Sequence, residues 1–301
     1  MGSSMRQQIR LFRVFGITVF LHWSWFLVAA YQLDRRSGQY SSFGWNIAEY
    51  LALFVIVLLH EFGHSLACRQ VGGTANEIVL WPLGGVAFVS PPPRPGAVLW
   101  SIAAGPLVNV VLLALLAAIG FGNHFLGGMV LPLSALHFLG QLTLINLGLL
   151  IFNLLPIYPL DGGQILRALL WFPLGRARSL TVAAGIGLVG AIGLLGLALY
   201  ARSMWTGIMA AFILSQCWRG FKEAQSLAKL AKMARHTEFA CPSCHAQPIQ
   251  AAIWVCSRCN QRFDAFESAG CPQCGMQSSV TTCPECRQAH PVSAWKPASL
   301  D

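Results

Sequence analysis

Residues 46–68 read NIAEYLALFVIVLLHEFGHSLAC, and the rest of the chain is best interpreted outward from this stretch. It is apolar and long enough to cross a bilayer as a helix, which takes about 20 residues. His60, Glu61 and His64 interrupt it near its end. On a helix, residues four apart share a face, so both imidazoles can point at one ion. Ionisable groups inside a span are costly and indicate a functional site.

The composition excludes an ordinary soluble globular domain. Of 301 residues, 55% are hydrophobic and only 10% are charged, and the mean hydropathy is +0.58. Such values are typical of a membrane protein. The basic start, residues 1–13, precedes an apolar run without a small-residue cleavage site, so we expect a retained first span and not a signal peptide.

Apolar windows of about 20 residues predict six transmembrane helices. They are Val14–Tyr31, Asn46–Cys68, Ala97–Phe121, Leu133–Leu155, Ala177–Ala201 and Met204–Trp218. With the N-terminus inside, thirteen Lys and Arg residues fall on the inner side and three on the outer side. Because cytoplasmic flanks are enriched in these residues, we expect a cell-membrane protein with both termini in the cytoplasm.

This topology places Asp161 at the same depth as His60 and His64. A catalytic zinc usually has three protein ligands, and Asp161 is one of only four acidic residues between Asn46 and Trp218. Such a zinc polarises a carbonyl and acidifies water, and Glu61 would move the proton. The alternatives are ordinary surface or capping histidines and, for Asp161, a turn residue before Gly162 and Gly163.

Three motifs together resemble the site-2 protease family of intramembrane zinc metalloproteases, in its compact prokaryotic form. The motifs are His60-Glu61-Phe62-Gly63-His64, Ala104-Gly105-Pro106-Leu107-Val108-Asn109 and Asn153-Leu154-Leu155-Pro156-Ile157-Tyr158-Pro159-Leu160-Asp161-Gly162-Gly163. The resemblance covers about residues 14–218.

The resemblance implies a role for each matching residue. His60, His64 and Asp161 would bind the catalytic zinc, and Glu61 would be the general base. Asn153 would lie near the substrate carbonyl, although an interhelical hydrogen bond explains it equally well. We interpret Asn109 and Asn146 as packing residues.

The segment Gly72–Val89 is apolar and β-prone, yet Pro82 and the pair Gly84-Gly85 break it. In the family such a segment forms a small membrane-embedded sheet to which the substrate adds as a strand, which makes Gly84 and Gly85 substrate-binding candidates. A re-entrant loop is the alternative. His22 is interpreted as part of an interfacial aromatic belt.

The chain changes character after Trp218. Residues 219–238 predict a basic amphipathic helix that lies on the inner leaflet or, equally, a solvated linker helix. Four Cys-x-x-Cys pairs follow. They are Cys241/Cys244, Cys256/Cys259, Cys271/Cys274 and Cys283/Cys286. This spacing predicts two structural zinc sites in a zinc-ribbon domain of residues 239–301. Sequential pairing, and nested pairing of the second pair with the third, both remain open.

The tail is neutral. From Cys241 to Asp301 it has four basic and four acidic residues, so no nucleic-acid partner is expected. A protein adaptor or a second protomer is the favoured partner of the tail.

The sequence thus predicts an all-α polytopic membrane protein of about six transmembrane helices, with a small membrane-embedded β segment and a double zinc-ribbon domain. Its parts are a cytoplasmic N-terminus (1–13), a metalloprotease core (14–218), the linker helix and the ribbon domain. The expected function is regulated intramembrane proteolysis of single-span proteins, releasing a fragment to the cytoplasm, with one catalytic and two structural zinc ions. A zinc transporter or metal sensor is the alternative, and Glu61 separates the two because transport needs no general base.

Overall fold

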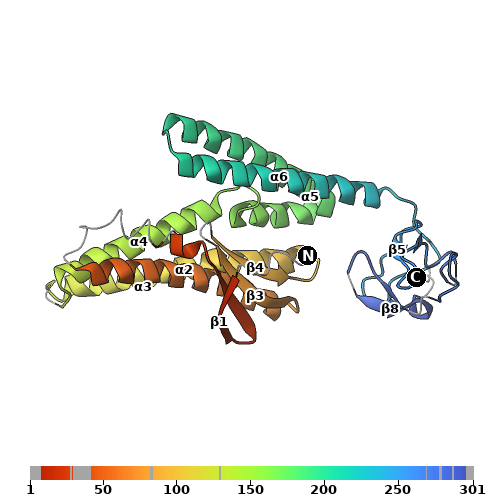
Figure 1. Cartoon of the computed structure of the whole chain (residues 1–301), viewed down its shortest axis with the longest axis horizontal. Coiled ribbons are helices and arrows are strands. Elements are labelled where there is room, and N and C mark those ends of the chain that lie inside the picture. Colours follow the sequence, from red (N-terminus) through yellow and green to blue (C-terminus); the bar gives the residue numbers. More distant parts are fainter. Residues whose placement is uncertain are drawn as a thin grey trace. The chain divides into compact units, whose positions relative to one another are not determined.

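The computed structural model describes residues 8–295 apart from 28, 30–41, 82–83, 129, 269, 278–279 and 287. The chain divides into two compact units, Met1–Phe221 and Lys222–Asp301 (Figure 1). Arg6, Arg35 and Arg36 of the charge count, and the end of the predicted first span, lie outside the described residues.

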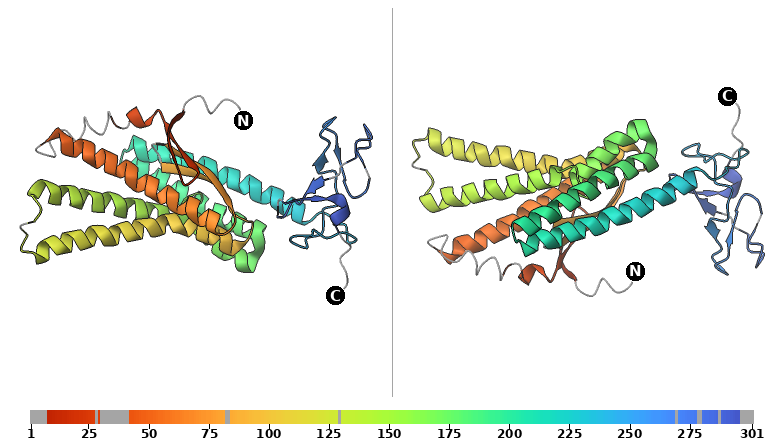
Figure 2. Two further views of the ribbon diagram at one scale, coloured as in Figure 1. Left: turned by 90° about the horizontal axis from the view of Figure 1, so that it is seen from below. Right: turned by 90° about the horizontal axis from the view of Figure 1, so that it is seen from above.

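Four helices in the described part of the first unit are long and apolar enough to cross a bilayer. They are α2 (Phe43–Gln70), α3 (Pro95–Phe125), α4 (Leu133–Leu154) and α5 (Asp161–Tyr200). Figure 2 shows α2, α3 and α4 side by side as long neighbouring helices, and each pair of them is in contact. These helices confirm the predicted second to fifth spans.

Helix α5 consists of two helical segments. Gly175 leaves the helical conformation with φ 76° and ψ 171°, so the element bends there. A left-handed φ suits glycine because it has no Cβ. The segment before the bend, which begins with Asp161, was not predicted as a helix.

A four-stranded sheet completes the first unit. Its strands are β1 (Gln8–Val14), β2 (Ile17–His22), β3 (Thr74–Trp81) and β4 (Gly84–Ser90), in the order β1-β2-β3-β4. Strands β2 and β3 are parallel and the other pairs are antiparallel. Parallel strands need a crossover, and α2 supplies it.

Alternate residues of the sheet pack on α2. Ile17, Val19, Ile78 and Leu80 are buried in one apolar cluster with Val57 and Leu58 of the helix. This period of two is typical of strands. The packing brings the sheet against the half of α2 that carries the His-Glu-Phe-Gly-His motif.

The prediction of a first transmembrane helix at Val14–Tyr31 is wrong over the residues of β2. Phe15 and Gly16, both with positive φ, form a turn between β1 and β2, and Arg69 donates hydrogen bonds to their carbonyl groups. Apolar length alone does not distinguish a buried strand from part of a helix. The unit is therefore not all-α.

The predicted β-prone segment does form strands β3 and β4, while its position in a membrane stays a prediction. The sixth predicted span is part of α6 (Met204–Ala231), a helix that is not among the four span candidates. Cys217 and Ile213 of α6 pack on Ile157 and Ala191. The predicted linker helix 219–238 is wrong beyond Ala231, because Arg235 forms a β-bridge with Ile249.

The second unit has little regular structure. Its described part contains two short antiparallel hairpins and one 3-10 helix. The hairpins are β5 (Trp254–Val255) with β6 (Arg262–Phe263) and β7 (Val280–Thr282) with β8 (Ala289–Pro291), and the 3-10 helix is η2 (Val292–Ala294). Aromatic rings of Phe239, Trp254 and Trp295 surround Phe266. Such a small core rarely folds without a further crosslink such as a metal.

The contact between α2 and α3 requires glycine at position 63. A Cβ there would lie 2.7 Å from the carbonyl oxygen of Ala104 and 2.9 Å from a methyl group of Val108. We expect Gly63→Ala to destabilise the protein by about 1–3 kcal/mol, the range for overpacking, measured by thermal unfolding in detergent. The control is Gly122→Ala in α3, where the new Cβ would point into open space. It should be neutral or stabilising, and equal effects of both changes would contradict the packing argument.

Candidate active site

Helix α2 places His60 and His64 one turn apart with their imidazoles facing each other. Their Nε2 atoms are 3.1 Å apart, and each residue is only 6% exposed. The pair lies where α2 packs on α3, and a Cβ on Gly105 of α3 would come within 2.3 Å of His64 Nε2. Glycine at this position therefore gives the two rings their room.

Asp161 reaches the same point from the first turn of α5. Its Oδ2 lies 3.0 Å from His60 Nε2 and 3.3 Å from His64 Nε2. The following glycines allow this approach, because a Cβ on Gly162 would meet the carbonyl oxygen of Leu154 at 2.3 Å and one on Gly163 the backbone nitrogen of Tyr158 at 2.3 Å. The turn and ligand interpretations of the motif are thus compatible.

Both histidines use their other ring nitrogen for a hydrogen bond. His60 Nδ1 donates to Asn109 Oδ1 at 2.8 Å, and His64 Nδ1 donates to the carbonyl oxygen of Ser101 at 2.9 Å. Since both acceptors lack a proton to give, each neutral ring carries its hydrogen on Nδ1. The two Nε2 lone pairs therefore face each other and the Asp161 carboxylate, which favours a bound cation.

The spacing of these three atoms fits zinc. Ligand atoms about 2.0–2.1 Å from a tetrahedral zinc lie about 3.3 Å from one another, close to the separations of the two Nε2 atoms and Asp161 Oδ2. His60, His64 and Asp161 form a potential metal-binding group. The donor set of two imidazoles and one carboxylate is typical of catalytic zinc.

Glu61 lies beside this group and is 6% exposed. Its Oε2 accepts a hydrogen bond of 2.9 Å from the backbone N–H of Ala87 in β4. A Cβ on Gly85 would lie 2.3 Å from Glu61 Cγ, so β4 approaches the carboxylate as closely as glycine permits. The sheet thus holds a buried carboxylate next to the three candidate ligands.

The contacts of Asn109 and Ser101 were missed by the sequence analysis. Asn109 contacts His60, so its interpretation as a packing residue is wrong. A signal was present, because Gly105 and Asn109 are four residues apart and therefore share a face of α3. No local pattern indicates Ser101, whose backbone carbonyl accepts the hydrogen bond.

The remaining candidates, Gly84, Asn153 and His22, lie in β4, α4 and β2 respectively. Gly84 pairs with Trp81 in the β3–β4 hairpin. Asn153 is half-buried in the last turn of α4. His22 stacks on Trp81 with ring centroids 4.3 Å apart, so it stabilises the sheet.

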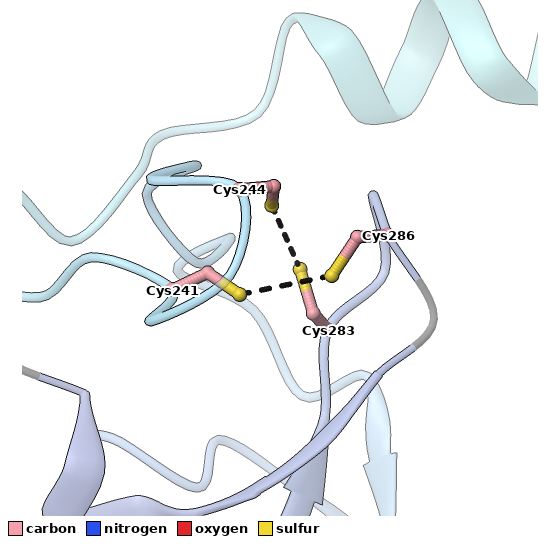
Figure 3. Close-up of side chains that lie close together, drawn as sticks. All are labelled: Cys241, Cys244, Cys283 and Cys286. Atoms are coloured by element: carbon pink, nitrogen blue, oxygen red, sulfur yellow. Dashed lines mark hydrogen bonds between the residues drawn. The ribbon is translucent and has the colours of Figure 1, made fainter. Parts of the chain in front are cut away.

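The tail cysteines form two groups, and their pairing is nested. Cys241, Cys244, Cys283 and Cys286 make the outer group, shown in Figure 3. Cys256, Cys259, Cys271 and Cys274 make the inner group. Closest sulfur atoms are 3.5–3.7 Å apart, close to the roughly 3.8 Å expected for thiolates 2.3 Å from a tetrahedral zinc.

Backbone N–H groups stabilise a thiolate in the inner group. Those of Cys259 and Arg258 lower the pKa of Cys256 to about 6. A thiolate is the form that binds metal. The four sulfur atoms of each group lie within 4.8 Å of one another, and this geometry suits structural zinc.

Comparisons with known proteins all point to zinc metalloproteases. The model of peptidase family M50 matches residues 48–197. Zinc metalloprotease MJ0392 of Methanocaldococcus jannaschii is 39% identical over 186 residues, which cover 61% of this chain and 51% of that protein. The putative zinc metalloprotease sll0528 of Synechocystis is 30% identical over 243 residues, covering 74% and 62%. The chain thus spans about half to two thirds of these relatives.

A solved structure supports the same assignment. The site-2 protease from Methanocaldococcus jannaschii superposes with a TM-score of 0.53 at 31% identity, covering 71% of this chain and 95% of that one. The matched M50 region contains His60, Glu61, His64 and Asp161. On these similarities, the chain belongs to peptidase family M50, the family of the site-2 proteases.

Proposed function

We propose that this protein is an intramembrane zinc metalloendopeptidase that cleaves membrane-protein substrates within or near their transmembrane segment. One observation carries the proposal: three lone-pair-bearing ligand atoms converge on one point, and a fourth buried group, Glu61, lies beside them without belonging to the set. The names of the relatives support it.

The buried residues divide the chemistry between them. His60, His64 and Asp161 would hold a zinc ion, which when bound supplies Lewis-acid polarisation of the scissile carbonyl and acidifies water. Glu61 keeps Oε2 on the Ala87 N–H, which leaves Oε1 to take a proton from the attacking water. The same carboxyl group then delivers this proton to the leaving amide nitrogen.

Strand β4 is a suitable place for the substrate backbone. It is an edge strand of the four-stranded sheet, so the side of β4 that faces away from β3 is not paired with another described strand. A peptide that adds to this edge as a strand would lie beside Glu61, because Ala87 and Gly85 of β4 already contact that side chain. Gly84 and Gly85 would then belong to the substrate-binding surface, and an unwound substrate would regain backbone hydrogen bonds.

Asn153 is proposed to contact the substrate carbonyl. Its neighbour Leu154 touches Gly162, which follows Asp161, so the last turn of α4 abuts the metal ligand. An amide at this place has a donor for a developing negative charge.

We propose further that both termini are cytoplasmic and that single-span substrates release a fragment inward. The Lys and Arg count behind this orientation assumed a first span at Val14–Tyr31, which strand β2 replaces over residues 17–22. The tail would bind a protein adaptor or a second protomer. Val255 and Met276, both adjacent to the inner cysteine group, are 55% and 41% exposed. Apolar exposure with neutral charge favours a protein partner over nucleic acid.

A transporter or sensor is less favoured by the site. A transit site needs ligands and a path, while Glu61 is a buried carboxylate aligned next to the ligands by two contacts with β4. Peptide hydrolysis requires a general base, and Glu61 is placed to act as one.

Replacement of Glu61 tests the mechanism. We expect Glu61→Gln to keep three zinc ions per chain and to cleave a single-span substrate in proteoliposomes about 10²- to 10⁴-fold more slowly, because the proton acceptor is lost. Glu49→Gln is the matched control, since Glu49 is a buried glutamate (4% exposed) of the same helix. Cleavage at the wild-type rate by the Glu61 variant would disprove the proposed mechanism.

Zinc counting tests the metal sites and their nested pairing. We expect three zinc ions per purified wild-type chain and two after His64→Ala. Cys241→Ser combined with Cys286→Ser should remove one ion, because both belong to the outer group. Cys241→Ser combined with Cys256→Ser should remove two, because each damages a different group. The reverse result would establish sequential pairing, and a wild-type content of two would refute one of the three sites.

A further inference from the structure

A chain of polar contacts runs from the candidate metal centre through two asparagines. His60 of α2 donates to Asn109 Oδ1 of α3 at 2.8 Å. Asn146 Nδ2 of α4 in turn donates to the backbone carbonyl oxygen of Asn109, also at 2.8 Å. Both asparagines are 0% exposed, so three long helices are joined at one buried point.

This arrangement is costly. Asn109 Nδ2 and Asn146 Oδ1 are buried and have no hydrogen-bond partner among the described residues. A buried polar atom without a partner costs about 1–3 kcal/mol. Leucine has a similar volume and would avoid this cost, so packing alone does not explain two asparagines here.

The orientation of Asn109 provides the explanation. Its Oδ1 can only accept, so it fixes the hydrogen of His60 on Nδ1 and directs the Nε2 lone pair at His64 and Asp161. In His64 the hydrogen on Nδ1 is fixed in the same way by the backbone carbonyl of Ser101, an acceptor that no side-chain change can remove. Asn109 is thus the side chain that orients a candidate ligand.

Asn146 acts one step further away. Its amide clamps the main chain of α3 at Asn109, so it fixes the residue whose side chain meets His60. Metal-bound histidines commonly depend on such an outer acceptor, whose loss lowers metal affinity about 10- to 100-fold.

We infer that Asn109 is a positioning residue for the metal ligand His60 and that Asn146 supports it by holding the α3 backbone. The inference rests on the proposed function, since it concerns the same metal centre. It adds a polar connection by which α4, a helix without a ligand of its own, influences zinc binding.

The test compares isosteric and acceptor-retaining variants of the full-length protein. Zinc per chain is measured over a graded series of chelator concentrations, and thiol reactivity shows whether the two cysteine groups remain metal-bound. We expect Asn109→Leu to release the catalytic zinc at a chelator concentration about 10- to 100-fold lower than the wild type requires. The other two ions should be retained. Asn109→Asp keeps an acceptor for the hydrogen on His60 Nδ1. It should therefore bind zinc more tightly than Asn109→Leu does.

Asn123→Leu is the matched control. Asn123 is a buried asparagine of the same helix and is 7% exposed. Its Oδ1 accepts a hydrogen bond from the backbone N–H of Leu131, and neither residue is close in sequence to a candidate metal ligand. Its replacement should leave zinc affinity unchanged. Equal loss of zinc in the Asn109 and Asn123 variants would reduce the effect to general destabilisation and overturn the inference.

Asn146→Leu keeps the inference testable if Asn109→Leu does not fold. It should weaken zinc binding less than loss of the direct acceptor does. In combination with Asn109→Leu it should add nothing, because it acts through that residue. Additive effects, or wild-type zinc affinity in Asn109→Leu, would overturn the inference. A wild-type protein with only two zinc ions would instead contradict the proposed function itself.

Discussion

The structure depends on the convergence of three lone pairs, from His60 Nε2, His64 Nε2 and Asp161 Oδ2. Without a cation these groups would repel one another or share protons, and the hydrogen bonds at both Nδ1 atoms direct the unprotonated nitrogens inward. Burial strengthens this constraint, because water cannot screen the charge. The point where Asp161 of α5 reaches His60 and His64 of α2 is thus suited to hold a metal ion.

Close backbone contacts bring the helices to this point. Gly63 lets α2 touch α3, Gly105 leaves space for the imidazoles, and Gly162 lets α5 begin against the end of α4. At each position a side chain would collide with backbone or with a ligand ring. Small residues at helix contacts are typical of membrane proteins, where no hydrophobic effect drives helices together. Here they also determine which side chains meet.

The sheet contributes the part of the site that is not metal-binding. Strand β4 contacts Glu61 through the Ala87 N–H and through Gly85, so the carboxylate is oriented by an element distant in sequence. The same packing explains why residues 17–22 are a strand. Their apolar side chains meet the same face of α2 that Ile78 and Leu80 cover. A mostly apolar run of this kind resembles part of a span, and its pairing with β3 becomes evident only in the fold.

The sequence by itself indicated four long apolar helices, the three candidate ligands, the candidate general base and the eight cysteines of two potential metal-binding groups. These features follow from local spacing: hydropathy over about 20 residues, the four-residue helical repeat and the Cys-x-x-Cys turn. Only the tertiary structure decided that residues 17–22 form a strand, that the cysteine groups are nested, and that Asn109 contacts His60. Each of these depends on which distant residues pack together. Such contacts are set by the shape of both partners, and neither partner's local sequence contains that information.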